Sequence, residues 1–479
     1  MDKLREECGV FGIFSKERSA LANDVYYALF ALQHRGQSSC GIVVNDDGVF
    51  NSYCDNGLVG DVFTTERLSS LGEGNAAVGH VRYGAEAGSA SRSNAQPLVV
   101  DHVKGRLAIA HNGSLINYAE LREELELEGK IFQSDGDAEV IAYEIIRQRL
   151  TSNSIEEAVS RAMDRLKGAY SLVVMSPSKI VVARDKHGFR PLCYGTTERG
   201  DFVAASESCA LDAVGATLVG DVEPGEILVF DRNGCRSIRD HCGEVKKSLC
   251  VFEFVYFARP DSVVDGSAVH IARQRAGAFL ALEHPVNADV VIGVPDSGID
   301  AAIGYARQSG IPYGVGLLKN KYIGRTFIAP VQKVREDKVR IKLNPIASTV
   351  AGKRVILIDD SIVRGTTSAR IVKLLREAGA TEIHMRISSP PFLNPCYYGT
   401  DIASRDVLIA HNYSIEEIAK IIGVDSLGYL SIENVKKIAD RCNKDDFCTA
   451  CFDNIYPTEE PSGRSRNRYD RKLSEKEGN

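Results

Sequence analysis

Several features of membrane, secreted and nucleic-acid-binding proteins are missing from this chain of 479 residues. No apolar run approaches the roughly 18–20 residues of a membrane-spanning helix, and residues 1–7 lack the apolar segment of a secretory signal. Positive charge is not in excess, because the formal net charge is -6. We therefore expect a cytoplasmic protein that binds no nucleic acid and no membrane, and that holds any anionic substrate through local groups.

The composition is otherwise that of an ordinary globular protein, with 44% hydrophobic and 25% charged residues. The length allows two or three domains, and no internal repeat of fixed period is present. In a reducing compartment the twelve cysteines are expected to serve as thiols, metal ligands or a nucleophile rather than as a disulfide framework.

The order of the predicted elements divides the chain into two halves. Up to about residue 245, short apolar runs predict strands, and helical patterns near residues 24–33 and 137–149 interrupt them. This mixture favours stacked sheets with helices outside. From about residue 288 strand, loop and helix alternate, which predicts a parallel sheet with crossover helices. Residues 458–479 are polar and charge-rich, and we expect a disordered tail there.

Cys8 stands between a charged leader, residues 1–7, and an apolar run that predicts a strand. If the leader is removed, Cys8 carries a thiol and a free α-amino group on one residue. A free thiol has a pKa near 8.5 and a free amino group one of about 7.7–8.0, so the amine can accept the thiol proton at neutral pH. Taken alone, Cys8 fits a small buried strand residue better than a nucleophile.

A phosphate-binding loop is predicted in the second half, where an apolar strand over residues 355–358 ends in Asp359 and Asp360. The loop that follows, SIVRGTTS, leads into a helix whose first N–H groups can bind phosphate, and Gly365 allows a close approach. The two acids fit instead a sugar's vicinal hydroxyls or a Mg²⁺ ion. The lysine and spacing of the G-x-x-x-x-G-K-[ST] nucleotide loop are absent, and an ordinary helix cap with chance acids is the alternative. The hydroxyl donors are Ser361, Thr366, Thr367 and Ser368.

The segment VILIDDSIVRGTTS resembles the phosphoribosyl-diphosphate signature of the type I phosphoribosyltransferases. The resemblance implies that the loop from Arg364 to Ser368 holds the 5′-phosphate, and that Asp359 and Asp360 hold the ribose hydroxyls and one Mg²⁺ per subunit. A second strand end, VVIGVPDSG, would place Asp296 and Ser297 beside the diphosphate, with Ser297 as a further magnesium ligand. The eight Lys and Arg of residues 319–342 favour a lid over the diphosphate, against the alternative of a solvated face.

Four short patterns in the first half can converge on Cys8. Arg82, in GHVRYG, offers a guanidinium for a substrate α-carboxylate. Asn112 and Gly113, in HNGS, offer an amide and a backbone N–H for an oxyanion, a contribution of roughly 3–4 kcal/mol per donor. Asp137, in DGDAEVI, can bind an α-ammonium group. Each pattern also has an ordinary explanation, since Asn-Gly is most often a turn and an Asp at a helix start is most often a cap.

The motifs CGVFGIF, LQHRGQ, GHVRYG, HNGSLINY and SDGDAE, in this order, resemble the N-terminal-nucleophile glutamine amidotransferases over most of residues 8–240. The resemblance implies an α+β glutaminase domain with αββα layers. It also implies a role for each matched residue: Cys8 as nucleophile and base, Arg82 and Asp137 as glutamine ligands, and Asn112 with Gly113 as the oxyanion hole.

One position departs from that family's pattern. Where relatives usually have Ser-Asp-Thr-Glu, this chain has an acid at both Asp135 and Asp137, so Asp135 competes for the ammonium. We prefer Asp137, because the Ala-Glu-Val-Ile that follows it aligns with the start of the helix.

Four cysteines form a separate candidate metal site. Cys448 and Cys451 are a C-x-x-C pair, which alone is too few ligands for zinc or an iron–sulfur cluster and is compatible with a redox dithiol. Cys250 lies near the join of the halves and Cys396 lies in PPFLNPCYYG. With these surroundings the chain resembles amidophosphoribosyltransferases of the cluster-containing, leader-processed type, which implies that the four cysteines ligate one [4Fe–4S] cluster per subunit. Thiolate ligation alone allows zinc as well.

The resemblances together imply a glutaminase domain over residues 8–245 and, over residues 246–457, an α/β type I phosphoribosyltransferase domain with a central parallel sheet. The implied reaction transfers ammonia from glutamine to phosphoribosyl diphosphate, giving 5-phosphoribosylamine, glutamate and diphosphate, the first step of de novo purine synthesis. Purine nucleotides as inhibitors and a homotetramer are implied too. An amidotransferase for a sugar phosphate or an ATP-activated acid is disfavoured by VILIDDSIVRGTTS. The rival from another class is a non-catalytic regulator that senses phosphoribosyl diphosphate.

Overall fold

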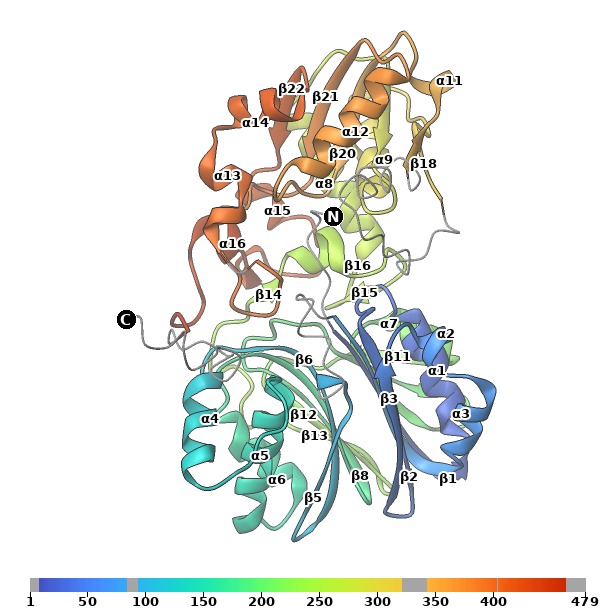
Figure 1. Ribbon diagram of the computed structural model, residues 1–479, viewed down its shortest axis with the longest axis vertical. Coiled ribbons are helices and arrows are strands. Elements are labelled where there is room, and N and C mark those ends of the chain that lie inside the picture. Colours follow the sequence, from blue (N-terminus) through green and yellow to red (C-terminus); the bar gives the residue numbers. More distant parts are fainter. Residues whose placement is uncertain (1–7, 84–93, 321–342, 403, 462–479) are drawn as a thin grey trace, which may run out of the picture.

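The computed structural model describes residues 8–83, 94–320, 343–402 and 404–461. These residues form two parts that lie end to end, a lower part with two stacked sheets and an upper part built on a parallel sheet (Figure 1). In the described ranges no helix combines the length and the apolar character needed to cross a membrane.

The first sheet of the lower part has seven strands, and each neighbouring pair is antiparallel. Its central strands are buried along nearly their whole length, because side chains pack against both faces. In spatial order the strands are β11 (Ala216–Asp221), β9 (Cys193–Thr197), β10 (Phe202–Ala205), β1 (Gly9–Ser19), β4 (Gly74–Arg82), β2 (Ser39–Asp46) and β3 (Val49–Asn56).

The second sheet of the lower part has six strands and is likewise antiparallel throughout. Its longest strand contains the Asn-Gly pair of HNGS. In spatial order the strands are β13 (Gly234–Ile238), β12 (Ile227–Asp231), β8 (Lys179–Arg184), β7 (Gly168–Ser176), β6 (Gly105–Leu115) and β5 (Leu98–His102).

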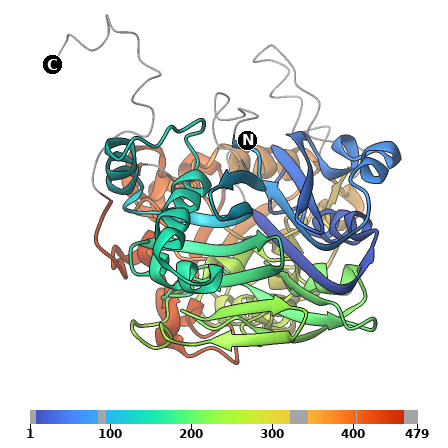
Figure 2. The ribbon, with the colours of Figure 1, turned by 90° about the horizontal axis from the view of Figure 1, so that it is seen from below.

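Helices cover the outer face of each sheet, and apolar side chains fill the space between the sheets, including Val10, Val78, Ala110 and Val173. The layers are therefore α–β–β–α, which confirms the predicted architecture; Figure 2 shows this part from below. The helices on the first sheet are α1 (Leu21–Ala31), α2 (Val59–Val62), α3 (Thr65–Ser70) and α7 (Ser208–Ala213), and those on the second are α4 (Tyr118–Leu127), α5 (Asp137–Thr151) and α6 (Ile155–Met163).

The upper part contains the predicted parallel sheet, in the order β17 (Val290–Gly293), β20 (Arg354–Asp359), β21 (Glu382–Ile387) and β22 (Ser426–Tyr429). Helices α8 (Val269–Glu283) and α9 (Gly298–Ser309) pack on one face, and α12 (Thr366–Glu377) and α14 (Ile415–Ile422) pack on the other. Because β17 and β20 are parallel neighbours in the sheet, the loops at their carboxyl ends lie side by side.

Shorter elements complete the upper part and the joint. They are β14 (Leu249–Cys250), η2 (Glu253–Phe257), β15 (Val263–Val264), β16 (Ser267–Ala268), β18 (Leu317–Lys319), β19 (Leu343–Pro345), α11 (Ala347–Val350), η3 (Arg405–Val407), α13 (Ile409–Asn412), α15 (Ile432–Val435), η4 (Lys444–Asp446), β23 (Phe447–Cys448) and α16 (Ala450–Asp453).

The beginning of the predicted tail contacts the folded part. Thr458 Oγ1 lies 2.8 Å from Tyr398 Oη, and Lys167 pairs with Glu459. The packed chain thus continues past the boundary at residue 458. The rest of the tail from residue 462, the leader over residues 1–7 and residues 321–342 of the predicted lid lie outside the described residues.

Candidate active sites

Cys8 lies directly before β1, where a buried arginine holds its main chain. Arg35 Nε donates to the carbonyl oxygen of Cys8 at 3.1 Å, and Arg35 is 1% exposed. Strand β1 runs antiparallel to β4 with Gly9 opposite Val81. The residues just beyond this pair, Cys8 and Arg82, therefore lie at the same end of the first sheet, as the glutamine-site prediction requires.

Asn112 and Gly113 lie inside strand β6 rather than in a turn. Asn112 is fully buried, and neither polar atom of its side chain has a hydrogen-bond partner among the described residues. Buried amides are nearly always paired, so this side chain is poised for a group that binds there. Gly113 has φ 138°, and a Cβ atom at this position would lie 2.2 Å from the carbonyl oxygen of Ala169. Only glycine fits.

Asp137 is the first residue of α5 and is 6% exposed. Its Oδ2 accepts the backbone N–H of Leu115 at 3.1 Å, two residues beyond Gly113 in β6. The competing acid, Asp135, is half-exposed and lies 3.6 Å from Arg122. The structure thus brings Asp137, and not Asp135, next to the Asn-Gly segment.

His80, which lies in the motif GHVRYG, joins the two sheets beside this site. Its Nε2 donates to the carbonyl oxygen of His111 at 3.0 Å, directly before Asn112. Burial, helped by the nearby Arg82 and His111, lowers the pKa of His80 to about 3 despite the opposing effect of that carbonyl. The imidazole is therefore neutral at pH 7. Sequence reasoning missed this residue, although its motif was recognised.

The second predicted site lies at the carboxyl end of β20. Asp359 and Asp360 are each 1% exposed. Asp360 accepts hydrogen bonds from Ser297 Oγ, at the start of α9, and from Ser361 Oγ at 2.5 Å. Its backbone N–H donates to Asp359 Oδ1 at 3.0 Å. The predicted magnesium ligands Ser297, Asp359 and Asp360 are thus gathered at one place.

The loop before α12 has the shape that an anion site needs. Gly365, the N-cap residue, has φ 80°, and a Cβ atom there would lie 2.7 Å from Ile409 Cδ1. The free N–H groups of the helix's first turn follow it. Of the predicted donors Arg364 and Thr366 are exposed, Thr367 is partly buried, and Ser361 and Ser368 are buried. Nearby, Asp296 pairs with Lys319, the first residue of the predicted lid.

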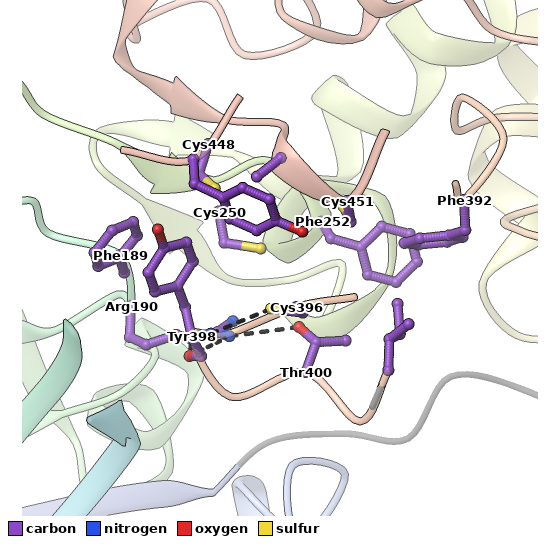
Figure 3. A pocket seen from close by; sticks show the side chains of 13 residues that line it. Phe189, Arg190, Cys250, Phe252, Phe392, Cys396, Tyr398, Thr400, Cys448 and Cys451 are labelled. Atoms are coloured by element: carbon purple, nitrogen blue, oxygen red, sulfur yellow. Dashed lines mark hydrogen bonds between the residues drawn. The ribbon is translucent and has the colours of Figure 1, made fainter. Parts of the chain in front are cut away.

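Cys250, Cys396, Cys448 and Cys451 surround one pocket at the joint, although they come from three distant segments (Figure 3). Cys250 lies opposite Cys448 in the register of the parallel strands β14 and β23. Burial, followed by the other three thiols, raises the pKa of Cys451 well above its ordinary value. The backbone N–H of Tyr398 donates to Cys396 Sγ at 3.4 Å. Four thiols around a pocket lined by aromatic residues, together with an N–H···S bond, fit a metal centre held by thiolates.

A different group of possible ligands occurs in the described residues, formed by Asp164, His241 and Glu244. Lys186 Nζ lies 3.0 Å from Asp164 Oδ1 and 2.7 Å from Glu244 Oε2. Since this ammonium group already neutralises the two carboxylates, we assign no metal there.

Comparisons with known proteins agree with this two-part arrangement. A family model described as a glutamine amidotransferase domain matches residues 85–213, and one described as a phosphoribosyl transferase domain matches residues 265–389. The amidophosphoribosyltransferase of Methanocaldococcus jannaschii is 48% identical over 466 residues, covering 94% of this chain and 98% of that protein. The amidophosphoribosyltransferase of Bacillus subtilis is 48% identical over 461 residues, covering 95% of each chain.

Solved structures agree as well. Glutamine phosphoribosylpyrophosphate amidotransferase from B. subtilis, solved in complex with ADP and GMP, superimposes with a TM-score of 0.88 at 46% identity and covers 94% of this chain and 98% of that chain. A glutamine amidotransferase part joined to a phosphoribosyltransferase part defines the class of the protein. The chain belongs to the amidophosphoribosyltransferase family, as its motifs predict.

Proposed function

We propose that this chain releases ammonia from glutamine in its lower part and transfers it to phosphoribosyl diphosphate in its upper part, giving 5-phosphoribosylamine, glutamate and diphosphate. This is the opening reaction of de novo purine synthesis. The observation that carries the proposal is the buried amide of Asn112, which has no partner among the described residues and lies in a strand that packs against β1. A protein that only senses phosphoribosyl diphosphate has no use for such a group.

In the proposed glutaminase reaction the α-amino group of Cys8 accepts the thiol proton, and the sulfur attacks the side-chain carbonyl of glutamine. Asn112 Nδ2 and the N–H of Gly113 stabilise the oxyanion. Arg82 binds the α-carboxylate and Asp137 the α-ammonium. Ammonia leaves with the transferred proton, and water then hydrolyses the thioester to glutamate. Removal of residues 1–7 is part of this proposal, because it creates the free amino group.

In the upper part we propose that the loop from Arg364 to Ser368 binds the 5′-phosphate. Asp359 and Asp360 hold the ribose hydroxyls. Ammonia attacks the anomeric carbon as the bond to diphosphate breaks. A Mg²⁺ ion held by Ser297, Asp359 and Asp360 would neutralise charge on the diphosphate. The hydrogen bonds that already join Ser297 and Ser361 to Asp360 support this ligand set.

We propose that the four thiols of the joint hold one [4Fe–4S] cluster per subunit. Zinc bonded at 2.3 Å to four sulfurs would bring those sulfurs to roughly 3.8 Å from one another. Among the described residues, no three of these thiols have sulfur atoms that all lie within 4.8 Å of one another. The wider spacing favours a polynuclear cluster over a single ion.

The remaining parts of the proposal concern organisation and control. We propose a glutaminase domain over residues 8–245, a phosphoribosyltransferase domain over residues 246–457, and a homotetramer in the cytoplasm, where reducing conditions suit twelve free cysteines. Purine nucleotides are proposed as inhibitors, and the B. subtilis relative that was solved with ADP and GMP supports this.

The test uses amide-¹⁵N-glutamine with phosphoribosyl diphosphate and Mg²⁺, followed by intact-mass analysis of the protein. We expect labelled phosphoribosylamine and a mature chain that begins at Cys8. A chain that still begins at Met1 and turns over no glutamine would favour the regulator instead.

A further inference from the structure

Four almost completely buried charged side chains form one hydrogen-bonded network at the joint between the two parts, namely Arg35, Arg190, Glu207 and Glu253. None of them was singled out from the sequence. We infer that Arg35, Glu253 and Arg190 are positioning residues that connect Cys8 to the loop carrying Cys396, so that the upper part sets the geometry of the glutaminase centre. This inference deepens the proposed function and depends on Cys8 being the nucleophile.

The first link runs from Cys8 into the upper part. Arg35 Nη1 and Nη2 each donate to Glu253 at 2.9 Å, one to Oε2 and the other to Oε1. Glu253 is the first residue of η2 and is 0% exposed. A guanidinium held in this two-pronged way has a fixed orientation. Its third nitrogen, Nε, is therefore directed at the carbonyl oxygen of Cys8, to which it donates a hydrogen bond of 3.1 Å.

The second link runs from Glu253 to the cysteine loop, residues 396–400. Arg190 Nη1 lies 3.4 Å from Glu253 Oε1. Its Nε and Nη2 donate to the carbonyl oxygen of Tyr398 at 3.1 and 2.7 Å, and Nη2 also lies 3.4 Å from Thr400 Oγ1. Figure 3 shows these bonds from Arg190 to the loop that carries Cys396. The path from the cysteine loop to the nucleophile is thus a continuous chain of hydrogen bonds, which are buried except for the partly buried bond to Cys8.

The same loop also lies against the oxyanion segment. Gly399 has φ 120°, and a Cβ atom placed on it would lie 3.5 Å from both Cα and the carbonyl carbon of Gly113. The cysteine loop therefore passes close to the proposed oxyanion hole and is linked to the nucleophile through Arg190, Glu253 and Arg35. A displacement of this loop would disturb both halves of the glutaminase centre together.

The formal charges of this network balance. Glu207 Oε1 accepts a further hydrogen bond from Arg35 Nη1 at 2.6 Å, so two carboxylates face two guanidinium groups. Burial raises the pKa of Glu207, but His34 and Arg35 outweigh burial and hold the pKa well below its ordinary value. Buried ion pairs add little stability compared with apolar residues of similar volume. The network's distinctive contribution is fixed geometry.

The test compares Glu253→Gln with a matched control, Asp265→Asn. Asp265 is also a buried acid at the joint, where its carboxylate pairs with Arg184 at 2.9 Å and with Lys247 at 2.7 Å. We expect Glu253→Gln to lower kcat with glutamine at least tenfold. Its KM for glutamine should change less than threefold and its ammonia-dependent rate less than twofold. Asp265→Asn should change none of these rates more than twofold.

Two further variants keep the inference falsifiable. If Glu253→Gln does not fold, Thr400→Val removes the 3.4 Å contact with Arg190, and it should lower kcat with glutamine about twofold to threefold without changing the ammonia-dependent rate. Equal loss with glutamine and ammonia in Glu253→Gln, or equal effects in the control, would mean a purely structural joint and would overturn the inference. Cys8→Ala distinguishes a failure of this inference from a failure of the proposed function. Glutamine-dependent synthesis that survives in Cys8→Ala contradicts the proposed function itself.

Discussion

In the lower part, the residues of the proposed glutamine site come from four separate segments, whereas in the upper part most of the proposed phosphoribosyl-diphosphate site comes from one strand, one loop and one helix. Cys8 and Arg82 are placed by the pairing of β1 with β4, and Asp137 by a hydrogen bond to β6. Asp359, Asp360 and the loop to Ser368 are nearly contiguous. The first site therefore depends on how distant segments pack, and the second depends mainly on local chain geometry.

The state of the polar groups differs as well. The amide of Asn112 has no partner in the described part of the chain, whereas Asp360 already accepts hydrogen bonds from Ser297 and Ser361. An unpaired buried amide costs roughly 1–3 kcal/mol, which is regained when a ligand pairs with it. The proposed lower site therefore has an unpaired amide that a ligand can satisfy, whereas the acid Asp360 of the proposed upper site is already held by hydrogen bonds.

The largest effect is expected at the upper site, because both nitrogen donors need it. Asp360→Asn removes a proposed ligand of ribose and Mg²⁺, a contribution of several kcal/mol, or on the order of 10³-fold in rate. Synthesis should fall by this factor with glutamine and with ammonia alike, measured as diphosphate release. A loss confined to glutamine would place Asp360 in the wrong site.

At the lower site, Asn112→Ala should lower the glutaminase kcat about 10²–10³-fold, since it removes one oxyanion donor. Ammonia-dependent synthesis should stay within about twofold of the original. The two rates are measured on the same preparation, so misfolding would be detected as a parallel loss. Unchanged kcat with glutamine would remove Asn112 from the mechanism.

Two neighbouring acids, Asp137 and Asp135, can be compared to test which one binds the ammonium group of glutamine. Asp137→Asn should raise the KM for glutamine about 10–100-fold, because a charge-assisted bond worth roughly 1.5–3 kcal/mol is lost. Asp135→Asn, which changes the half-exposed neighbour, should alter KM less than about twofold. Steady-state glutaminase kinetics distinguish the two, and a reversed order would assign the ammonium to Asp135.

The smallest effect concerns the joint rather than either site. Burial, and then Asp265, raises the pKa of Asp221 from 3.8 to about 6. The folded protein therefore binds this proton more tightly than the unfolded chain, and stability falls as pH rises through this window. Asp221→Asn should increase the free energy of unfolding at pH 7 by about 1–2 kcal/mol and have no effect below pH 4. Thermal unfolding at both pH values measures this, and a destabilised variant at pH 7 would contradict the assignment.

Sequence alone was sufficient where the signal is local. The strand, the acid pair and the loop after β20 follow one another in the chain, so the strand–loop–helix unit that carries the proposed phosphate site could be predicted directly. Helix α6 also has a local signal in the sequence, since Ser154 caps it and the apolar residues Ile155, Ala158, Val159 and Ala162 are buried at helical spacing.

Other features could not be read from the sequence because tertiary packing decides them. Asn112–Gly113 has the composition of a turn, yet it lies within a strand where the backbone of Ala169 leaves no room for a side chain at Gly113. Arg35 and Glu253 are 218 positions apart and carry charges that usually lie at the surface. Only the folded chain shows that they meet next to Cys8.

The central claim is that the thiol of Cys8 is required to release ammonia from glutamine and takes no part in the reaction at the ribose. Synthesis by Cys8→Ala should therefore be measured with glutamine and with ammonia as alternative donors. The account predicts a loss of at least 10³-fold with glutamine and an unchanged rate with ammonia. Glutamine-dependent synthesis that survives the replacement, or ammonia-dependent synthesis that is lost with it, would contradict the account.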